Sequence, residues 1–124
     1  MRNAEERLGM EQLKQRTKEF ALKVIHLTES LPTNRSTDVL GRQLLRSGTS
    51  VAANYRAACR GRSPAEFQAK MGIVEEEADE SALWLEMLAS AGHVPLERIQ
   101  PLLQEANELT AIAVSSIRTS RKNQ

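Results

Sequence analysis

The run from Gly41 to Ser63, GRQLLRSGTSVAANYRAACRGRS, constrains the fold more than any other stretch of the chain. At about 100° per residue, its helical arginines fall within an arc of roughly 80°, and apolar or small residues gather on the far side. The arginines are Arg42, Arg46, Arg56 and Arg60, and the residues opposite them are Leu44, Leu45, Gly48, Val51, Ala52, Tyr55 and Cys59. This division predicts a helix with one buried side and one cationic side.

Apolar residues recur at spacings of three and four along the rest of the chain, and they nowhere alternate over the length of a strand. Four helices are therefore predicted, over about 10–31, 37–60, 64–91 and 98–120. Because the connections between them are short, successive helices are expected to be antiparallel. The expected fold is all-α, an antiparallel up-down-up-down four-helix bundle, and the 124 residues are expected to form a single domain, 1–124.

Local signals place the starts of two of these helices. Ser63-Pro64-Ala65-Glu66 predicts the start of the third helix, with serine at the cap, proline at the first helical position and glutamate three residues after the serine. The second is expected to begin at Thr37 or Asp38, because either side chain can cap free backbone amides. The fourth is harder to place, because Pro95 and Pro101 interrupt its pattern. We place its start near Arg98.

Charge and composition narrow the classes of function. Lys and Arg number 17 and Asp and Glu number 16, so the net charge near +1 gives no overall attraction to nucleic acid or membranes. Any such attraction must be local. The chain has one cysteine, no apolar run that could span a bilayer, and charged residues near its amino terminus, which together argue against secretion and insertion. We expect a soluble, cytoplasmic protein.

Three segments carry a resemblance to a known family. They are RQLLRSGTSVAANYRAACRGRS (Arg42–Ser63), EFQAKMGIVEEEADES (Glu66–Ser81) and WLEML (Trp84–Leu88), and they cover over a third of the chain. In these segments the chain resembles the four-helix bundle proteins first noticed in intervening sequences of bacterial 23S ribosomal RNA genes. The resemblance implies an antiparallel bundle that assembles into a ring-shaped homopentamer.

Some of these relatives accompany diversity-generating retroelements, so the resemblance also implies nucleic acid and a reverse transcriptase as partners. Most members have no assigned activity, and no catalytic residues of the family map onto this sequence. Where some relatives have a small, serine-containing segment, this chain has Glu75, Glu76 and Glu77. This departure makes the third predicted helix more acidic and weakens a nucleic-acid role carried over from relatives.

The arginine stripe has two interpretations. In the first, Arg42, Arg46, Arg56, Arg60 and also Arg62 hold phosphate groups without reading base sequence, because guanidinium groups pair well with phosphate oxygens. In the second, the arginines are solvated or pair with carboxylates of the third helix, which is the commoner arrangement. Only 3% of the residues are aromatic, so the composition does not indicate a platform for stacking bases.

The third predicted helix has a second apolar edge. Ile73 and Trp84 lie roughly 100° to 120° from its main apolar stripe, and Glu77, Glu80 and Met87 flank them. A tryptophan on a separate face is either the widened edge of the core or a contact with another subunit. The family resemblance favours the subunit contact.

The interior is expected to contain Leu44, Val51, Tyr55, Phe67, Met71, Val74 and Leu85. Gly48 and Ala52 share the apolar face of the second helix, so a neighbouring helix is expected to run close against them. A ligand pocket at these small residues is the less favoured alternative.

No catalytic, cofactor or metal site is indicated. Paired metal sites in helical bundles use a glutamate three residues before a histidine, and neither His26 nor His93 has one. Cys59 is expected to be an inert core residue. Because neither a Gly-rich phosphate loop nor a nucleophile with a base is found, we do not expect an enzyme.

Two classes of function remain. The first is a noncatalytic oligomeric scaffold or adaptor that binds nucleic acid, or a nucleic-acid-processing protein, through its arginine-rich face. The second is a protein-only regulatory or structural assembly, in which the arginines are solvated or pair with acidic side chains of neighbours. The sequence does not identify the partner.

Overall fold

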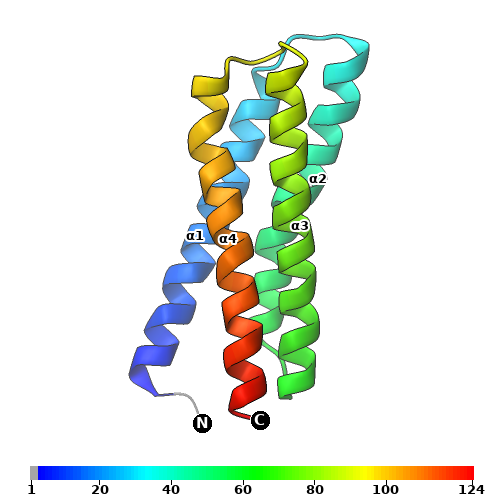
Figure 1. The fold of residues 1–124 in the computed structure, drawn as a ribbon. Coiled ribbons are helices and arrows are strands. Elements are labelled where there is room, and N and C mark those ends of the chain that lie inside the picture. Colours follow the sequence, from blue (N-terminus) through cyan, green and yellow to red (C-terminus); the bar gives the residue numbers. More distant parts are fainter. Residues whose placement is uncertain (1–2) are drawn as a thin grey trace.

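The computed structural model describes residues 3–124, which form four helices, and it confirms the expected all-α bundle. The helices are α1 (Ala4–Glu29), α2 (Arg35–Cys59), α3 (Pro64–Ser90) and α4 (Leu96–Lys122). They run alternately up and down, so both ends of the chain lie at the same end of the bundle (Figure 1). We call this the terminal end, and the turn between α2 and α3 lies there too.

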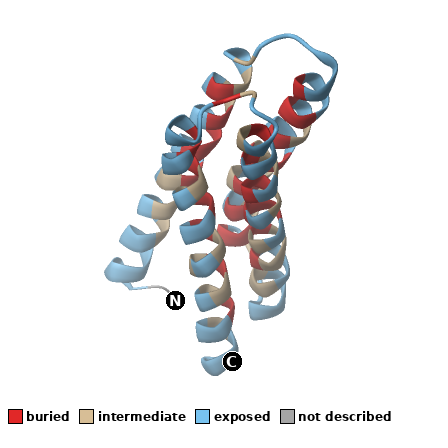
Figure 2. Ribbon diagram, turned by 45° about the horizontal axis from the view of Figure 1, so that its top comes forward, coloured by how far each residue is buried: buried red, intermediate tan, exposed pale blue. Residues whose placement is uncertain are grey.

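The first helix begins at Ala4, ahead of the predicted start near Met10. The Asn3 side chain caps it by accepting a hydrogen bond from the backbone N–H of Glu6. Apolar periodicity does not mark this part of α1, because none of its residues before Thr17 is buried. Figure 2 shows the start of α1 as an exposed stretch.

The second helix covers Arg35–Cys59, where the sequence predicts 37–60. Its cap is Asn34, whose side chain accepts a hydrogen bond from the backbone N–H of Thr37. Thr37 is therefore not the cap. It completes a capping box instead, because its hydroxyl accepts a hydrogen bond from the backbone N–H of Asn34.

The fourth helix covers Leu96–Lys122, where the sequence predicts 98–120. Pro95 occupies the cap position, and its carbonyl accepts a hydrogen bond from the backbone N–H of Ile99. Pro101 lies inside the helix. It is tolerated because it removes one backbone hydrogen bond close to the exposed start of the helix.

One core runs through the bundle, and all four helices contribute to it. Its largest fully buried side chains are Phe20, Leu44, Met71, Leu85, Leu88, Ile99 and Leu109. Six of the seven predicted interior residues are buried, but Phe67 is only partly buried. Leu45, predicted on the buried face of α2, is 37% exposed. It lies roughly 160° around the helix from Ser47, which contacts α3.

Small residues set the spacing between α2 and both of its neighbours, as the sequence predicts for Gly48. A Cβ atom at Gly48 would lie 2.9 to 3.1 Å from side-chain carbons of Val24 in α1. Toward α3, the hydroxyl oxygens of Ser47 and Ser81 are 2.8 Å apart, and both side chains are fully buried. Larger side chains at these positions would push the helices apart.

Candidate functional site

Arg46 belongs to the predicted arginine face, but its side chain reaches α3 and binds two carboxylates there. Its Nη1 lies 2.9 Å from Glu77 Oε2, and its Nη2 lies 2.6 Å from Glu80 Oε1. We call these three residues the α2–α3 clamp. Glu77 is buried, so its carboxylate depends on this pairing. For Arg46, the structure therefore follows the second interpretation of the stripe, pairing with the third helix.

Glu80 and Trp84 complete the surroundings of this clamp. Partial burial raises the pKa of the Glu80 carboxyl group, and the nearby Glu77 carboxylate raises it further. Arg46 and the Trp84 indole act against this rise, because both stabilise the charged form of Glu80. The Trp84 Nε1 is buried and has no well-formed hydrogen bond within residues 3–124. Trp84 is therefore packed against the core but only partly buried in it, and its indole lies near Glu80.

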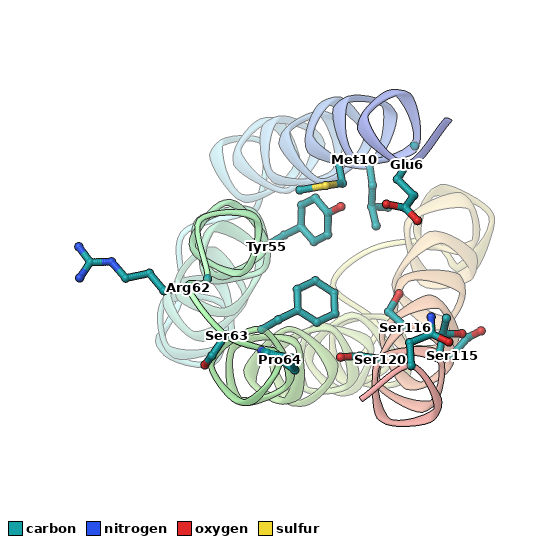
Figure 3. A pocket seen from close by; sticks show the side chains of 15 residues that line it. Glu6, Met10, Tyr55, Arg62, Ser63, Pro64, Ser115, Ser116 and Ser120 are labelled. Atoms are coloured by element: carbon teal, nitrogen blue, oxygen red, sulfur yellow. The ribbon is translucent and has the colours of Figure 1, made fainter. Parts of the chain in front are cut away.

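The other arginines of the stripe form no ion pair with a carboxylate in the described part of the chain. The Nε of Arg42 donates a hydrogen bond to the backbone carbonyl of Asp38, 3.1 Å away. Arg56 and Arg60 are exposed near the end of α2. The side chain of Arg62 extends away from the bundle (Figure 3). We call Arg56, Arg60 and Arg62 the terminal arginine group.

The predicted subunit edge of α3 is a mixed surface. Ile73 and Trp84 are partly buried, and Met87 is 41% exposed. The predicted flanking residues Glu77 and Glu80 are occupied within the chain by the α2–α3 clamp. The apolar side chains of this edge are those of Ile73, Trp84 and Met87.

A second clamp of the same kind joins α1 to α4. The Nε and Nη2 of Arg16 each lie 2.7 Å from an oxygen of Glu105, and Nη2 lies 2.8 Å from Glu108 Oε1. Hydrogen bonding to Glu105 raises the pKa of the Arg16 guanidinium, which stays charged. The sequence analysis does not predict this α1–α4 clamp. A signal is present, however, because Glu105 and Glu108 have the same spacing as Glu77 and Glu80.

A cavity of about 770 Å³ opens at the terminal end of the bundle. Its apolar wall is formed by Met10, Leu13, Tyr55 and Phe67, and its α4 side carries the hydroxyl groups of Ser115, Ser116, Thr119 and Ser120. Met10 and Tyr55 point into the cavity, whereas Arg62 points away from it (Figure 3). Phe67 is only partly buried because it lines this cavity, where the helices do not pack together around a filled core.

Residues of the kinds that could form a metal or nucleophilic site also lie in the described part of the chain. Within residues 3–124, no three His, Cys, Asp or Glu side chains are grouped so that they could hold a metal ion. Cys59 is buried. The Nε2 of His93 lies 2.7 Å from Ser36 Oγ, which ties the α3–α4 connection to the start of α2. Over the same residues, no helix is both long and apolar enough to cross a membrane.

Comparison with known proteins agrees with this architecture. The family described as 23S rRNA-intervening sequence protein matches residues 11–115. The chain belongs to this family. It is also similar to a crystal structure of a protein of unknown function from the S23 ribosomal protein family of Bacteroides thetaiotaomicron VPI-5482, with 31% identity and a TM-score of 0.81. That match covers 88% of this chain and 97% of the other. No curated protein matches the chain.

The part matched by the 23S rRNA-intervening sequence protein family contains both clamps but only part of the cavity. Arg16 and Glu108 lie within residues 11–115, whereas Met10 and Ser120 lie outside them. Both clamps therefore join helices of the shared fold. Because the solved relative is itself described as a protein of unknown function, family membership establishes the fold and not an activity.

Proposed function

We propose that this protein is a noncatalytic oligomeric scaffold or adaptor that holds nucleic acid, or a nucleic-acid-processing protein, through the terminal arginine group. The division of the α2 arginines into two sets carries this proposal. Arg46 is used inside the protomer, whereas Arg56, Arg60 and Arg62 are exposed and have no ion pair within residues 3–124. Such guanidinium groups are available to phosphate oxygens. A cytoplasmic location is part of the proposal, supported by the low cysteine content of the sequence, one residue in 124.

Assembly into a ring, the homopentamer that the family resemblance implies, is the second part of the proposal. A ring would repeat the terminal arginine group and turn weak contacts into avidity. The partly exposed apolar edge at Ile73, Trp84 and Met87 supports it. Sedimentation velocity should show one species of several protomer masses, and Trp84→Ala combined with Ile73→Asp should lower that mass. A monomeric wild type would contradict the ring.

A protein-only assembly is the second candidate function, and the α2–α3 clamp favours it. Arg46 belongs to the predicted cationic face and pairs with two glutamates of the same chain. The net charge near +1 also gives no general attraction to nucleic acid. In this alternative, the terminal arginine group pairs with acidic side chains of a partner protein.

Binding of labelled DNA or RNA, followed by fluorescence anisotropy at low salt, separates the two candidates. Arg56→Gln combined with Arg60→Gln should weaken binding to unrelated sequences alike and flatten its salt dependence, because fewer phosphates are neutralised. Lys18→Gln combined with Lys23→Gln removes the same charge from the exposed side of α1 and should leave most of the binding. If the wild type binds neither single strands nor duplexes, the nucleic-acid proposal fails and the protein-only assembly replaces it.

A further inference from the structure

Two exposed leucines lie beside charged residues of opposite sign on α2 and α3. Leu45 is 37% exposed and Leu83 is 47% exposed. On α2, Arg42 lies one turn before Leu45 on the same face. On α3, Leu83 lies between Asp79 and Glu86. None of these charged side chains forms an ion pair within residues 3–124. We call the two surfaces the cationic stripe and the anionic stripe.

The two stripes face opposite sides of the α2–α3 pair. Ser47 and Ser81 mark the line along which the helices touch, because their hydroxyl oxygens are 2.8 Å apart. At about 100° per residue, the cationic stripe lies roughly 140° to 160° around α2 from Ser47, and the anionic stripe lies at the same angle around α3 from Ser81. One protomer therefore presents opposite charges on opposite sides, as a head-to-tail contact requires.

The same serine contact gives the height of each stripe residue along the bundle. In antiparallel helices, a residue before Ser47 is level with the residue equally far after Ser81. Rotation about an axis parallel to the bundle leaves heights unchanged, so level residues meet when α2 of one copy lies beside α3 of the next. The pairs at equal height are Arg42 with Glu86, Leu45 with Leu83, and Thr49 with Asp79.

We propose that the cationic stripe of one protomer packs on the anionic stripe of a second copy of this chain. The proposal rests on the ring proposed above and names the surfaces that join its subunits. Each exposed leucine is covered by the other, and Arg42 meets the carboxylate of Glu86. Leu83 lies one turn before Met87, so the contact continues onto the predicted subunit edge of α3.

The charge match ends where the terminal arginine group begins. Arg56 is level with Gly72 and Arg60 is level with Gln68, and neither of these α3 residues carries a charge. Arg56 and Arg60 therefore remain outside the contact and available to a polyanion. Arg42, in contrast, moves from the predicted nucleic-acid set to the subunit contact.

Charge reversal tests the contact. Sedimentation velocity over a concentration series compares the wild type with Arg42→Glu, Glu86→Arg and the double variant. Each single reversal places like charges opposite each other and should raise the concentration needed for assembly by about tenfold or more. The double variant restores an opposite-charge pair and should return assembly toward the wild type. Both side chains are exposed, so circular dichroism should show unchanged helix content.

The matched control is Arg118→Glu, which reverses an exposed arginine of α4 and should leave assembly unchanged. If the wild type assembles and both single variants assemble as well as it does, this contact is overturned while the ring proposal stands. If the double variant fails to restore assembly, the contact is also overturned, because the two residues then act separately. A wild type that is monomeric at every concentration overturns the contact and the ring together.

Discussion

The α2–α3 and α1–α4 helix pairs are joined by the same arrangement of ion pairs, yet the two helices of each pair pack together to different extents. In each pair one arginine lies between two glutamates three residues apart. The clamps are Arg46 with Glu77 and Glu80, and Arg16 with Glu105 and Glu108. The first pair is packed closely, whereas α1 and α4 make far fewer close approaches and diverge at the terminal end (Figure 1). Ion pairing alone therefore does not decide how closely two helices pack.

The residues beneath the clamps account for the difference. Beside the α2–α3 clamp, the small buried side chains of Ser47 and Ser81 let the two helices approach. In α1, no residue before Thr17 is buried, and Met10 and Leu13, which are only partly buried against the core, line the cavity. The surfaces proposed for assembly lie on α2 and α3, the closely packed pair, whereas the terminal arginine group proposed for binding lies at the open terminal end.

Truncation of the two phenylalanines should give the largest contrast between the closed part of the bundle and its open end. Phe20→Ala removes a side chain that is 1% exposed and should lower the free energy of unfolding by about 3 to 5 kcal/mol. Phe67→Ala removes a partly buried side chain of the cavity wall and should cost clearly less. Denaturant unfolding measures both values. Equal losses would mean that the terminal end is as well packed as the middle.

Replacement of the clamp arginines should give a smaller difference in stability between the two helix pairs. Arg46→Met leaves Glu77, whose side chain is 11% exposed, without its partner and should cost about 1 to 3 kcal/mol. Arg16→Met leaves Glu105 and Glu108, whose side chains are 25% and 49% exposed, and should cost less than about 1 kcal/mol. Chemical denaturation of both variants provides the comparison. A larger loss for Arg16→Met would reverse our ranking of the clamps.

Glycine replacements test whether small residues close the α2 contacts. Gly48→Ala would bring a Cβ within 2.9 Å of Val24 and should destabilise the protein by about 1 to 3 kcal/mol. Gly72→Ala is the control, because nothing lies within 4 Å of the added Cβ, and it should stabilise α3 by about 0.5 to 1 kcal/mol. Thermal melting should show shifts of opposite sign. Equal stabilisation by both would mean that Gly48 does not set the spacing.

The dependence of stability on pH should show the smallest effect. Because the pKa of Glu80 is raised in the folded protein, the folded state binds this proton more readily than the unfolded state. The resulting stability is present below the usual carboxyl pKa and is lost as the pH rises through the raised value. Glu80→Gln should flatten this decline in melting temperature across the acidic range. A decline of wild-type size in Glu80→Gln would assign it to other groups.

The apolar periodicity predicts four helices and their order, and the Ser63–Pro64 signal predicts the start of α3, because both depend on local sequence. The early start of α1 is not predicted, since an exposed helix end has no buried apolar stripe. The sequence also does not predict which arginines of the stripe pair with α3 and which stay unpaired with a carboxylate in the described part of the chain. Arg46 reaches α3 and Arg42 does not because of the rotation of α2 against its neighbour, which the sequence pattern of one helix does not contain.

The contrast between the closed and open helix pairs is tested most directly by amide hydrogen exchange of the wild type. Exchange reports local opening, which is most frequent where few side chains are buried. We expect the slowest exchange around Ser47 in α2 and Ser81 in α3, and the fastest helical exchange in α1 before Thr17 and in α4 after Ile117. Exchange in the first part of α1 as slow as that around Ser47 would contradict the contrast, because α1 would then be held as firmly as the closed pair.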